Sequence, residues 1–489
     1  MASRLRAPAA LVASALLFYF GTGFAPIPAL TWLAPLPVLL LAPRVSARST
    51  FCVALLAYLL GLGNQFEFFL KTPSVPLPIG IAIVIGSSLL FGLVAWLFRA
   101  LLLRGLPLLA ASAPPAVWVA FMYVTVLANP TGIVWPLATS VADVPVVIQI
   151  ASVTGTWGVT FFVLMVPAAI AAVAWPGAVP RARLRTGVAG VAACAVVLGF
   201  GVLRLADAGG PVAQRVVVMS ASRFQWAPDA AGPGGQALIK DYAARIAALP
   251  EGTMAVLPEG ALGTDEDSLP GALQPLRAVA RERGVDVVVG IVHTTPEIKY
   301  NYSVHLPADG SAPVSYTKWH FAPGAPFRRG DALVFAHGHG RDVGLANCMD
   351  LNFPTPIRGY ALAGARLLAT PAADEFGNGR QHSRNALLRG VENGLSVAWA
   401  AQQGTPMISD PWGRVLAETD TETSSSPFVM AAAGVPEGPG TTVYARFGDW
   451  FAWLCLALAA AGGLRLLRRG RSAPETAGTR RAVHTAHSA

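Results

Sequence analysis

Charged side chains are scarce in the first part of this chain. Residues 1–210 contain only 14 Asp, Glu, Lys and Arg residues, whereas the whole 489-residue chain has 36 basic and 27 acidic ones. Charged residues are expensive in hydrocarbon, so this distribution predicts a membrane-embedded first part and a mostly water-facing second part. A disordered chain is excluded because 54% of the residues are hydrophobic, and a disulfide scaffold is excluded because there are only four cysteines.

The apolar runs predict a helical membrane domain. A helix needs about 20 apolar residues to cross the hydrocarbon core. The candidate spans are 8–24, 26–43, 51–68, 78–103, 108–128, 156–175, 186–205 and 449–467. Four prolines make the second span the weakest, and the shorter run 143–152 suits the membrane interface.

These spans divide the chain into four parts. We expect a transmembrane domain of about seven helices over 1–210, a polar domain over 211–447, a C-terminal transmembrane helix over 448–469 and a disordered cytoplasmic tail over 470–489.

Arginines predict the orientation of the chain. They form five groups beside the candidate spans: Arg4 and Arg6; Arg44 and Arg48; Arg99 and Arg104; Arg181, Arg183 and Arg185; and Arg465, Arg468, Arg469 and Arg471. With seven spans before the polar domain, all five groups fall on one side, which the positive-inside rule identifies as the cytoplasm. The polar domain is then extracytoplasmic. The net charge of +9 follows from this topology and does not by itself indicate a nucleic-acid partner.

Strands and helices alternate in the polar domain, which predicts an α/β fold. The predicted strands are 215–221, 254–257, 285–292, 301–306, 342–348, 365–371 and 395–402. The predicted helices are 234–249, 269–283, 380–393 and a further one after Pro354.

Three residues in this domain are candidates for chemistry. Cys348 ends one strand before a polar turn, Glu259 follows another, and Lys318 lies in the segment Tyr316-Thr317-Lys318-Trp319-His320. Strand ends at one edge of an α/β sheet converge, so a nucleophile, a base and an ammonium group could meet there. Taken singly, Cys348 is as compatible with a buried core residue, and Glu259 and Lys318 with solvated surface charges. The other three cysteines lie in apolar spans and read as small buried hydrophobes.

The order of these residues resembles the nitrilase, or carbon–nitrogen hydrolase, superfamily. Together with the flanking spans, the chain resembles the apolipoprotein N-acyltransferase family. Further matching segments are Phe224-Gln225-Trp226, the helix from Arg380-Gln381-His382 to Glu392-Asn393-Gly394, and Thr441 to Asp449 before the last span. The resemblance implies an extracytoplasmic α-β-β-α sandwich domain on a helical bundle of about eight spans in a bacterial cytoplasmic membrane.

The resemblance also implies roles. Cys348 would take a fatty acyl chain from a phospholipid as a thioester, with Glu259 as the base and Lys318 stabilising the oxyanion and lowering the thiol pKa. The acyl chain would pass to the N-terminal amine of a lipoprotein diacylglyceryl-cysteine. Trp226, His320 and Asp350 would support the site or bind substrate. No metal or other cofactor is implied, and His320 and His382 lack partners at metal-ligand spacing.

Two features of the chain depart from the family pattern. Pro326 stands where the family usually carries a loop Glu, and Met349-Asp350 stands where it often has Tyr-Glu. A membrane-anchored amidase that gives its acyl-enzyme to water therefore stays open, since it differs only in the second nucleophile. A non-catalytic lipid-binding scaffold is a third reading, which the complete Glu–Lys–Cys set argues against. A transporter is disfavoured because the spans carry charged residues only near their ends.

Overall fold

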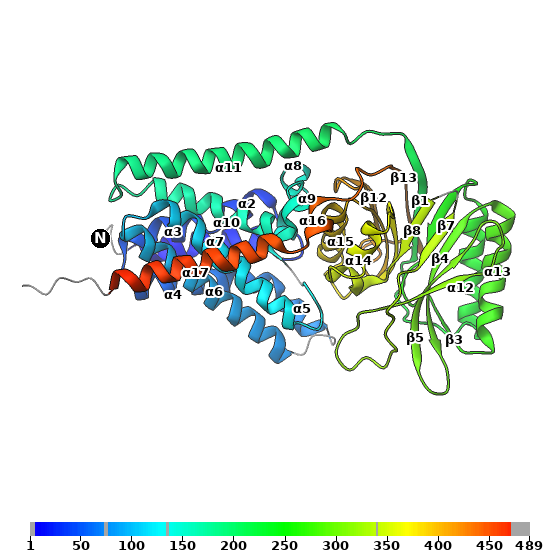
Figure 1. Cartoon of the computed structure of the whole chain (residues 1–489). Helices are drawn as coiled ribbons and strands as arrows, with labels where there is room; N and C mark the ends of the chain where they lie inside the picture. The colour runs from blue at the N-terminus through cyan, green and yellow to red at the C-terminus, as the bar shows by residue number, and fades with distance from the viewer. Residues whose placement is uncertain (1–4, 73–76, 134–135, 339–340, 471–489) are drawn as a thin grey trace, which may run out of the picture.

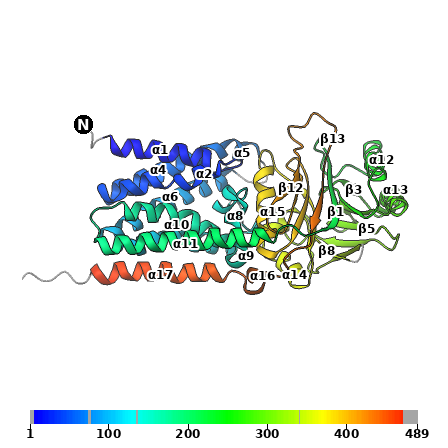
Figure 2. The same cartoon turned by 90° about the horizontal axis from the view of Figure 1, so that it is seen from above.

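The computed structural model describes residues 5–72, 77–133, 136–338 and 341–470. A helical bundle forms one end of the molecule and an α/β domain forms the other (Figure 1). Viewed from above, the bundle helices lie side by side along the long axis of the molecule (Figure 2). The chain returns from the domain to the bundle through its last helix, so the domain is attached at both ends.

The bundle is built from segments on both sides of the domain in sequence. Its longer helices are α1 (Arg6–Gly21), α4 (Ala47–Gly61), α6 (Leu77–Leu103), α7 (Pro107–Ala128), α10 (Thr156–Val173), α11 (Pro180–Ala206) and α17 (Trp450–Gly470). Its shorter helices are α2 (Pro28–Leu33), α3 (Leu36–Leu41), α5 (Phe66–Lys71), α8 (Pro145–Ile148) and α9 (Ala151–Thr154).

Five helical segments in the described ranges are long and apolar enough to cross a membrane. They are Ala47–Lys71, Leu77–Leu103, Pro107–Ala128, Thr156–Val173 and Pro180–Ala206. The apolar helices Arg6–Gly21 and Trp450–Arg465 are shorter. The prediction of one helix over 26–43 is wrong: α2 and α3 are separated at Ala34 and Pro35, because proline removes a backbone donor and favours a helix start. The total of eight spans stays a prediction.

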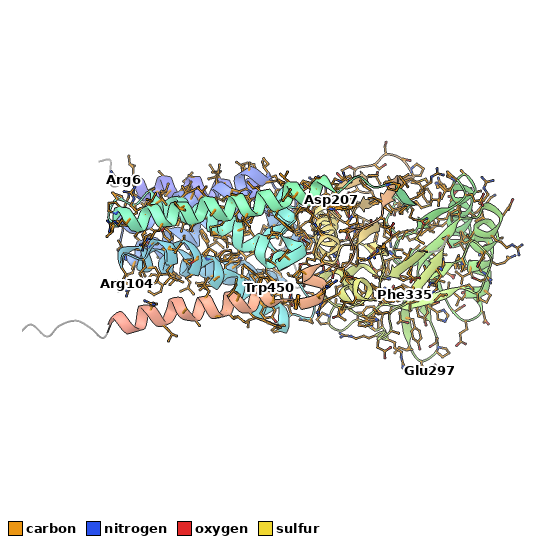
Figure 3. All side chains as sticks on the ribbon, turned by 45° about the horizontal axis from the view of Figure 1, so that its top comes forward. Arg6, Arg104, Asp207, Glu297, Phe335 and Trp450 are labelled. Carbon is orange, nitrogen blue, oxygen red and sulfur yellow. The ribbon has the colours of Figure 1, made fainter. Side chains whose placement is uncertain are left out.

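Arginines gather at the end of the bundle that lies away from the domain. Figure 3 labels Arg6 and Arg104 at that end, and Asp207 and Trp450 near the domain. Arg99 Nε donates to the Val45 carbonyl at 2.8 Å, and the guanidinium of Arg44 lies 5.5 Å from the centre of a Trp175 ring. Arginine groups from different loops therefore meet at one end of the bundle. Their side of the membrane, and the cytoplasmic tail, remain predictions; the tail beyond residue 470 lies outside the described residues.

The α/β domain contains two sheets. The first has the strand order β13-β1-β2-β4-β5-β6, with β3 also paired to β4. Its strands are β1 (Val212–Ala221), β2 (Thr253–Val256), β3 (Leu262–Thr264), β4 (Asp286–Thr294), β5 (Lys299–Leu306), β6 (Val314–Thr317) and β13 (Phe428–Pro436). The second has the order β12-β11-β10-β9-β8-β7. Its strands are β7 (Phe335–Gly338), β8 (Arg341–Leu345), β9 (Leu367–Ala373), β10 (Ser396–Gln402), β11 (Met407–Ser409) and β12 (Val415–Glu418).

Alternating side chains make each sheet two-faced, and this builds an α-β-β-α sandwich. In β1, Val216 and Val218 join the core between the sheets, whereas Val217 and Met219 join the core beneath the outer helices. Those outer helices are α12 (Pro233–Ala247) and α13 (Ser268–Arg283). The second sheet is covered by α14 (Ile357–Leu362) and α15 (Gly379–Asn393), with α16 (Val443–Phe447) leading to α17.

The predicted α/β pattern of the polar domain is confirmed. The seven strands and four helices expected from the sequence correspond to β1, β2, β4, β5, β8, β9 and β10, and to α12, α13, α14 and α15. The elements that the sequence did not predict are β3, β6, β7, β11, β12, β13 and α16. Most of these are short or lie towards a sheet edge, where a strand needs no continuous apolar run.

Polar contacts join the domain to the bundle through α15 and its neighbours. Glu392 Oε1 accepts from the backbone N–H of Thr156 at 2.7 Å, at the first residue of α10. Arg384 Nε donates to Asp143 Oδ1 at 2.6 Å, and Gln149 Nε2 donates to the Trp412 carbonyl at 2.7 Å. The segment 143–152 thus lies at the junction between bundle and domain.

Candidate active site

The three residues singled out from the sequence meet at the ends of strands from both sheets. Glu259 follows β2 and Lys318 follows β6 in the first sheet, whereas Cys348 follows β8 in the second. All three are buried, with exposed fractions of 3%, 5% and 6%. Lys318 Nζ lies 2.5 Å from Glu259 Oε1, and both charges act on the Cys348 thiol. The site is therefore an enclosed carboxylate–ammonium–thiol group.

Hydrogen bonds from three strands fix Glu259. Asn301 Nδ2, on β5, donates to the same Oε1 atom at 2.7 Å. The backbone N–H of Glu259 donates to the Ala372 carbonyl at 3.2 Å, and Gln402 Nε2 donates to the Glu259 carbonyl at 2.5 Å. The carboxylate thus keeps one orientation, with Oε1 bound to both Lys318 and Asn301.

Cys348 occupies a strained turn. Its φ angle is +39°, a conformation that is uncommon for a residue with a side chain. The turn opens a 3₁₀ helix, Cys348–Asn352, whose first residues are held by a capping box between Asn347 and Asp350. The Sγ atom lies 3.3 Å from the Ala373 carbonyl, which accepts its hydrogen bond. A strand, a strained residue and a helix start are also the parts that present a nucleophile in other enzymes.

Asp350 joins the nucleophile turn to the segment that carries Lys318. Its fully buried carboxylate accepts from Tyr316 Oη at 2.7 Å and from the backbone N–H groups of Trp319 and His320 at 3.2 and 3.0 Å. The His320 ring stacks on Phe353 with 3.7 Å between ring centres. Asp350 and His320 therefore connect the Cys348 turn to the Lys318 segment, and neither makes a hydrogen bond to the thiol among the described residues; their supporting roles stay a prediction.

Aromatic side chains surround the site. Trp226 is 42% exposed, and its indole packs against Gly260, the neighbour of Glu259. Phe321 and Phe327 stack with 5.1 Å between ring centres, in the loop that contains Pro326. Pro326 carries no charge and no backbone donor, so the loop is held by aromatic packing at this point.

Burial and charge set the protonation of the site. Burial raises the pKa of the Cys348 thiol well above its usual value, the charge of Glu259 raises it further, and Lys318 lowers it. Burial lowers the pKa of Lys318, but nearby negative charges, above all that of Glu259, outweigh burial, so its net shift is upward. Lys318 does lower the thiol pKa, as the resemblance implied, but burial and Glu259 raise that pKa by more. At rest the site holds a protonated thiol, so a base must remove that proton before the sulfur attacks.

Several buried polar residues at or near the candidate site were not predicted from the sequence. Asn301 and Gln402 lie on strands, and their side chains read there as ordinary polar positions. Asp374 is buried directly after β9, and its Oδ1 lies 2.8 Å from His382 Nδ1. Burial raises the pKa of Asp374, and His382 partly opposes the shift. The signal that found Glu259, a carboxylate directly after a buried strand, would also have found Asp374.

Two family models match this chain. The carbon–nitrogen hydrolase model matches residues 210–433, and the model named apolipoprotein N-acyltransferase N-terminal domain matches residues 14–169. The first match covers most of the α/β domain and the second covers most of the bundle. With the apolar helices, these matches identify a multi-pass membrane protein that carries a carbon–nitrogen hydrolase domain.

Individual relatives agree with both matches. An apolipoprotein N-acyltransferase from Geobacter metallireducens is 33% identical over 153 residues, covering 30% of this chain and 27% of the relative. One from Gloeobacter violaceus is 35% identical over 118 residues, covering 24% and 22%. The alignments thus span about a quarter of the length of these relatives. A deaminated glutathione amidase from Rattus norvegicus is 32% identical over 169 residues, covering 28% of this chain and 51% of the relative.

Among solved structures, the chain is similar to an amidase from Nesterenkonia sp. AN1. The identity is 23% and the TM-score is 0.39, with 46% of this chain and 93% of the amidase covered.

Proposed function

We propose that this chain is an apolipoprotein N-acyltransferase, which transfers a fatty acyl chain from a phospholipid to a lipoprotein. The match of residues 14–169 to the N-acyltransferase N-terminal domain and the similarity to two N-acyltransferases support this proposal. The acceptor is the N-terminal amine of a diacylglyceryl-cysteine. The observation that carries this proposal is the buried Glu259–Lys318–Cys348 group in a domain that the chain joins to an apolar bundle at both ends. Asn301, Asp350 and the strained Cys348 turn support these three as the catalytic residues.

The first half-reaction forms a thioester. Glu259 accepts the thiol proton as Cys348 Sγ attacks the ester carbonyl of the phospholipid, and the ammonium of Lys318 stabilises the oxyanion. The carbon–oxygen ester bond then breaks, Glu259 returns the proton to the departing oxygen, and lysophospholipid leaves. The 2.5 Å contact between Lys318 and Glu259 supports this division of labour, because it holds the base and the cation together and both charges influence the thiol.

The second half-reaction forms an amide. The neutral α-amine of the acceptor attacks the thioester carbonyl, Glu259 takes a proton from the nitrogen, and the carbon–sulfur bond breaks. The sulfur leaves as a thiolate and regains a proton from Glu259, which restores the resting site. The two substrates thus react in turn with one acyl-enzyme, which is a ping-pong scheme.

The bundle fits this chemistry because both substrates are anchored in lipid. A soluble enzyme would have to extract each acyl chain from the bilayer at a cost of about 0.8 kcal/mol for every CH₂ group. We further propose that the domain lies on the extracytoplasmic face of a bacterial cytoplasmic membrane. This placement is supported by the arginines at the far end of the bundle.

A membrane-anchored amidase or hydrolase is the second candidate. It is favoured by the alignment with a deaminated glutathione amidase and by Pro326, which removes the family's loop Glu. Water would then replace the amine as the second nucleophile. The match of 14–169 to the N-acyltransferase N-terminal domain favours transfer to a lipid-anchored amine instead.

Intact mass spectrometry tests the proposal. The wild-type chain and Cys348→Ala are incubated with vesicles of a phospholipid that has one defined acyl composition. We expect a hydroxylamine-labile mass increase of one acyl chain on the wild type alone, which disappears when a diacylglyceryl-cysteine peptide is added and becomes an amide on that peptide.

The other outcomes separate the alternatives. An adduct that decays to free fatty acid at the same rate with and without the peptide would identify a hydrolase. No adduct on a wild-type chain that binds the lipid would contradict the thioester mechanism and favour a lipid-binding scaffold.

A further inference from the structure

A cavity of about 210 Å³ lies where the bundle meets the α/β domain. Its wall combines the end of α7, the start of α10, the residues after the Cys348 turn, α15, and the segment from α16 to α17. Figure 1 shows these elements meeting at the boundary between bundle and domain, and Figure 3 labels Trp450 near it. Glu259, Lys318 and Cys348 are not among the described residues that line it.

One wall of the cavity carries a buried guanidinium. Arg389 is 3% exposed, and its hydrogen bonds use Nε and Nη1 only. Nε donates to the Leu351 carbonyl at 3.2 Å, while Nη1 donates to Glu392 Oε2 at 2.5 Å and to Tyr444 Oη at 3.4 Å. Nη2 is left without an acceptor in the described part of the chain. The cavity therefore offers a buried cationic donor to a ligand.

A carboxylate lines the same cavity. Asp449 Oδ1 accepts from Trp157 Nε1 at 2.7 Å and from Tyr444 Oη at 3.0 Å. Its other oxygen, Oδ2, has no donor among the residues that the structure describes. The charged residues that line the cavity are therefore one cation, Arg389, and one anion, Asp449. A ligand that bonds to both Arg389 Nη2 and Asp449 Oδ2 needs an anionic oxygen for the first atom and a cationic amine for the second.

The remaining wall is apolar and faces the bundle surface. Val126, Leu127 and Ile133 line it, and Leu127 is 69% exposed. Trp450 and Trp453 begin α17 near this level, and Trp453 Nε1 donates to Tyr123 Oη at 2.8 Å. Tryptophan and tyrosine gather where the hydrocarbon core meets the headgroup layer of a bilayer. The cavity thus combines charged and apolar lining residues, close to tryptophan and tyrosine side chains of the kind that mark a headgroup layer.

We propose that this cavity binds the headgroup of a zwitterionic phospholipid. Its phosphate accepts from Arg389 Nη2, its ammonium donates to Asp449 Oδ2, and its acyl chains run past Val126 and Leu127 into the bilayer. Arg389 also bonds Leu351 in the Cys348 turn, so the bound lipid contacts the element that carries the nucleophile through one side chain. The inference requires the bundle to lie in a membrane but does not require acyl transfer.

Lipid titration by native mass spectrometry tests the proposal on the full chain with Cys348→Ala, which prevents turnover. The probes are phosphatidylethanolamine and phosphatidylglycerol with identical acyl chains. We expect phosphatidylethanolamine to bind about tenfold more tightly, because only its ammonium can donate a charge-assisted hydrogen bond to Asp449. Asp449→Asn keeps an acceptor for Trp157 but removes the charge, and should weaken phosphatidylethanolamine alone by about tenfold. Arg389→Lys keeps a cation for Glu392 and should weaken both lipids.

Asp207→Asn is the matched control, since it removes one exposed carboxylate near the same end of the bundle and should change neither affinity. Equal losses for both lipids in Asp449→Asn, or no loss in either variant, would overturn the proposal and leave a solvent-filled cavity. Water-soluble phosphoethanolamine that binds as tightly as the lipid would overturn the part played by the apolar wall. A thermal melt of each variant separates lost binding from lost folding. Acyl-enzyme formation is measured separately, on the wild-type chain that retains Cys348. Failure of lipid binding in this cavity can therefore be told apart from failure of the proposed acyl transfer.

Discussion

The two helical layers of the sandwich occupy equivalent positions but have different surroundings. Helix α13 covers the first sheet and buries only Ala272, Leu276, Val279 and Ala280, whereas thirteen of the fifteen residues of α15 are buried. The reason is visible in Figure 1: α13 faces solvent, and α15 lies between the second sheet and the bundle. Charged residues on α13 can stay hydrated, but those on α15 must find partners.

Those partners come from distant parts of the chain. Arg384 pairs with Asp143 and Glu418, and Arg389 pairs with Glu392, which also receives the N–H of Thr156. The bundle is thus joined to the domain through buried polar groups, and burying any of them without its partner would destabilise the fold. The comparison teaches that an outer layer of this fold can become an interior layer if its charges are paired.

The most severe way to break this arrangement is Glu392→Ala. It leaves Arg389 buried without its main counter-charge, and removing one partner of a buried pair costs about 3–5 kcal/mol. The matched change on the solvent layer, Glu282→Ala, should cost less than about 0.5 kcal/mol because Glu282 is exposed. Thermal unfolding of both variants in one detergent measures the difference. Equal melting temperatures would contradict the view that α15 is an interior helix, and Glu392→Gln should fall between the two.

The C-terminal caps of the two helices give a smaller and sharper test. Gly284 ends α13 with φ +63°, and Gly394 ends α15 with φ +72°. Alanine at either position costs about 1–2 kcal/mol because its Cβ disfavours this conformation. At Gly284 the added Cβ would meet the movable Glu251 side chain, but at Gly394 it would lie 2.3 Å from the Gly440 carbonyl oxygen. Gly394→Ala should therefore lose about 1–3 kcal/mol more, as overpacking does.

Melting temperatures of the two glycine variants measure that extra loss. A larger drop for Gly284→Ala would mean that the junction around Gly440 yields more easily than the solvent-facing loop at Glu251.

The two sheets can be compared at the site itself, because the first supplies Glu259 and Lys318 and the second supplies Cys348. Burial and Glu259 raise the pKa of the thiol, so its reaction with iodoacetamide should be slow at pH 7 and should accelerate as the pH rises. Glu259→Gln removes a negative charge, lowers the thiol pKa and should increase the rate at pH 8 several-fold. Lys318→Met should decrease the rate.

Peptide mapping by mass spectrometry follows Cys348 specifically and uses Cys455 in α17 as an internal reference. A slower reaction in Glu259→Gln would show that the carboxylate acts on the thiol mainly by taking its proton rather than through its charge.

The sequence was informative where chemistry coincided with a local pattern. Glu259 and Cys348 stand out because each lies within three residues of the end of a strand, and Lys318 because lysine is rare in this chain. Asn301 gave no such signal, since its contact with Glu259 depends on the order of strands in the first sheet, where β4 lies between β5 and the strand that precedes Glu259. The break between α2 and α3 was signalled by its prolines, but only the structure located it at Ala34 and Pro35.

The sequence by itself determined the apolar first part and the alternating strands and helices of the domain. These features depend on hydrophobic periodicity, which neighbouring residues specify together. The three candidate site residues were singled out as a set by their resemblance to a known family, and their roles stay predictions. Only the tertiary structure decided that the polar helix α15 is buried, because Glu392 and its partner Thr156 lie 236 residues apart. Burial of a charge depends on what folds against it, and that information is spread over two distant segments rather than contained in either one.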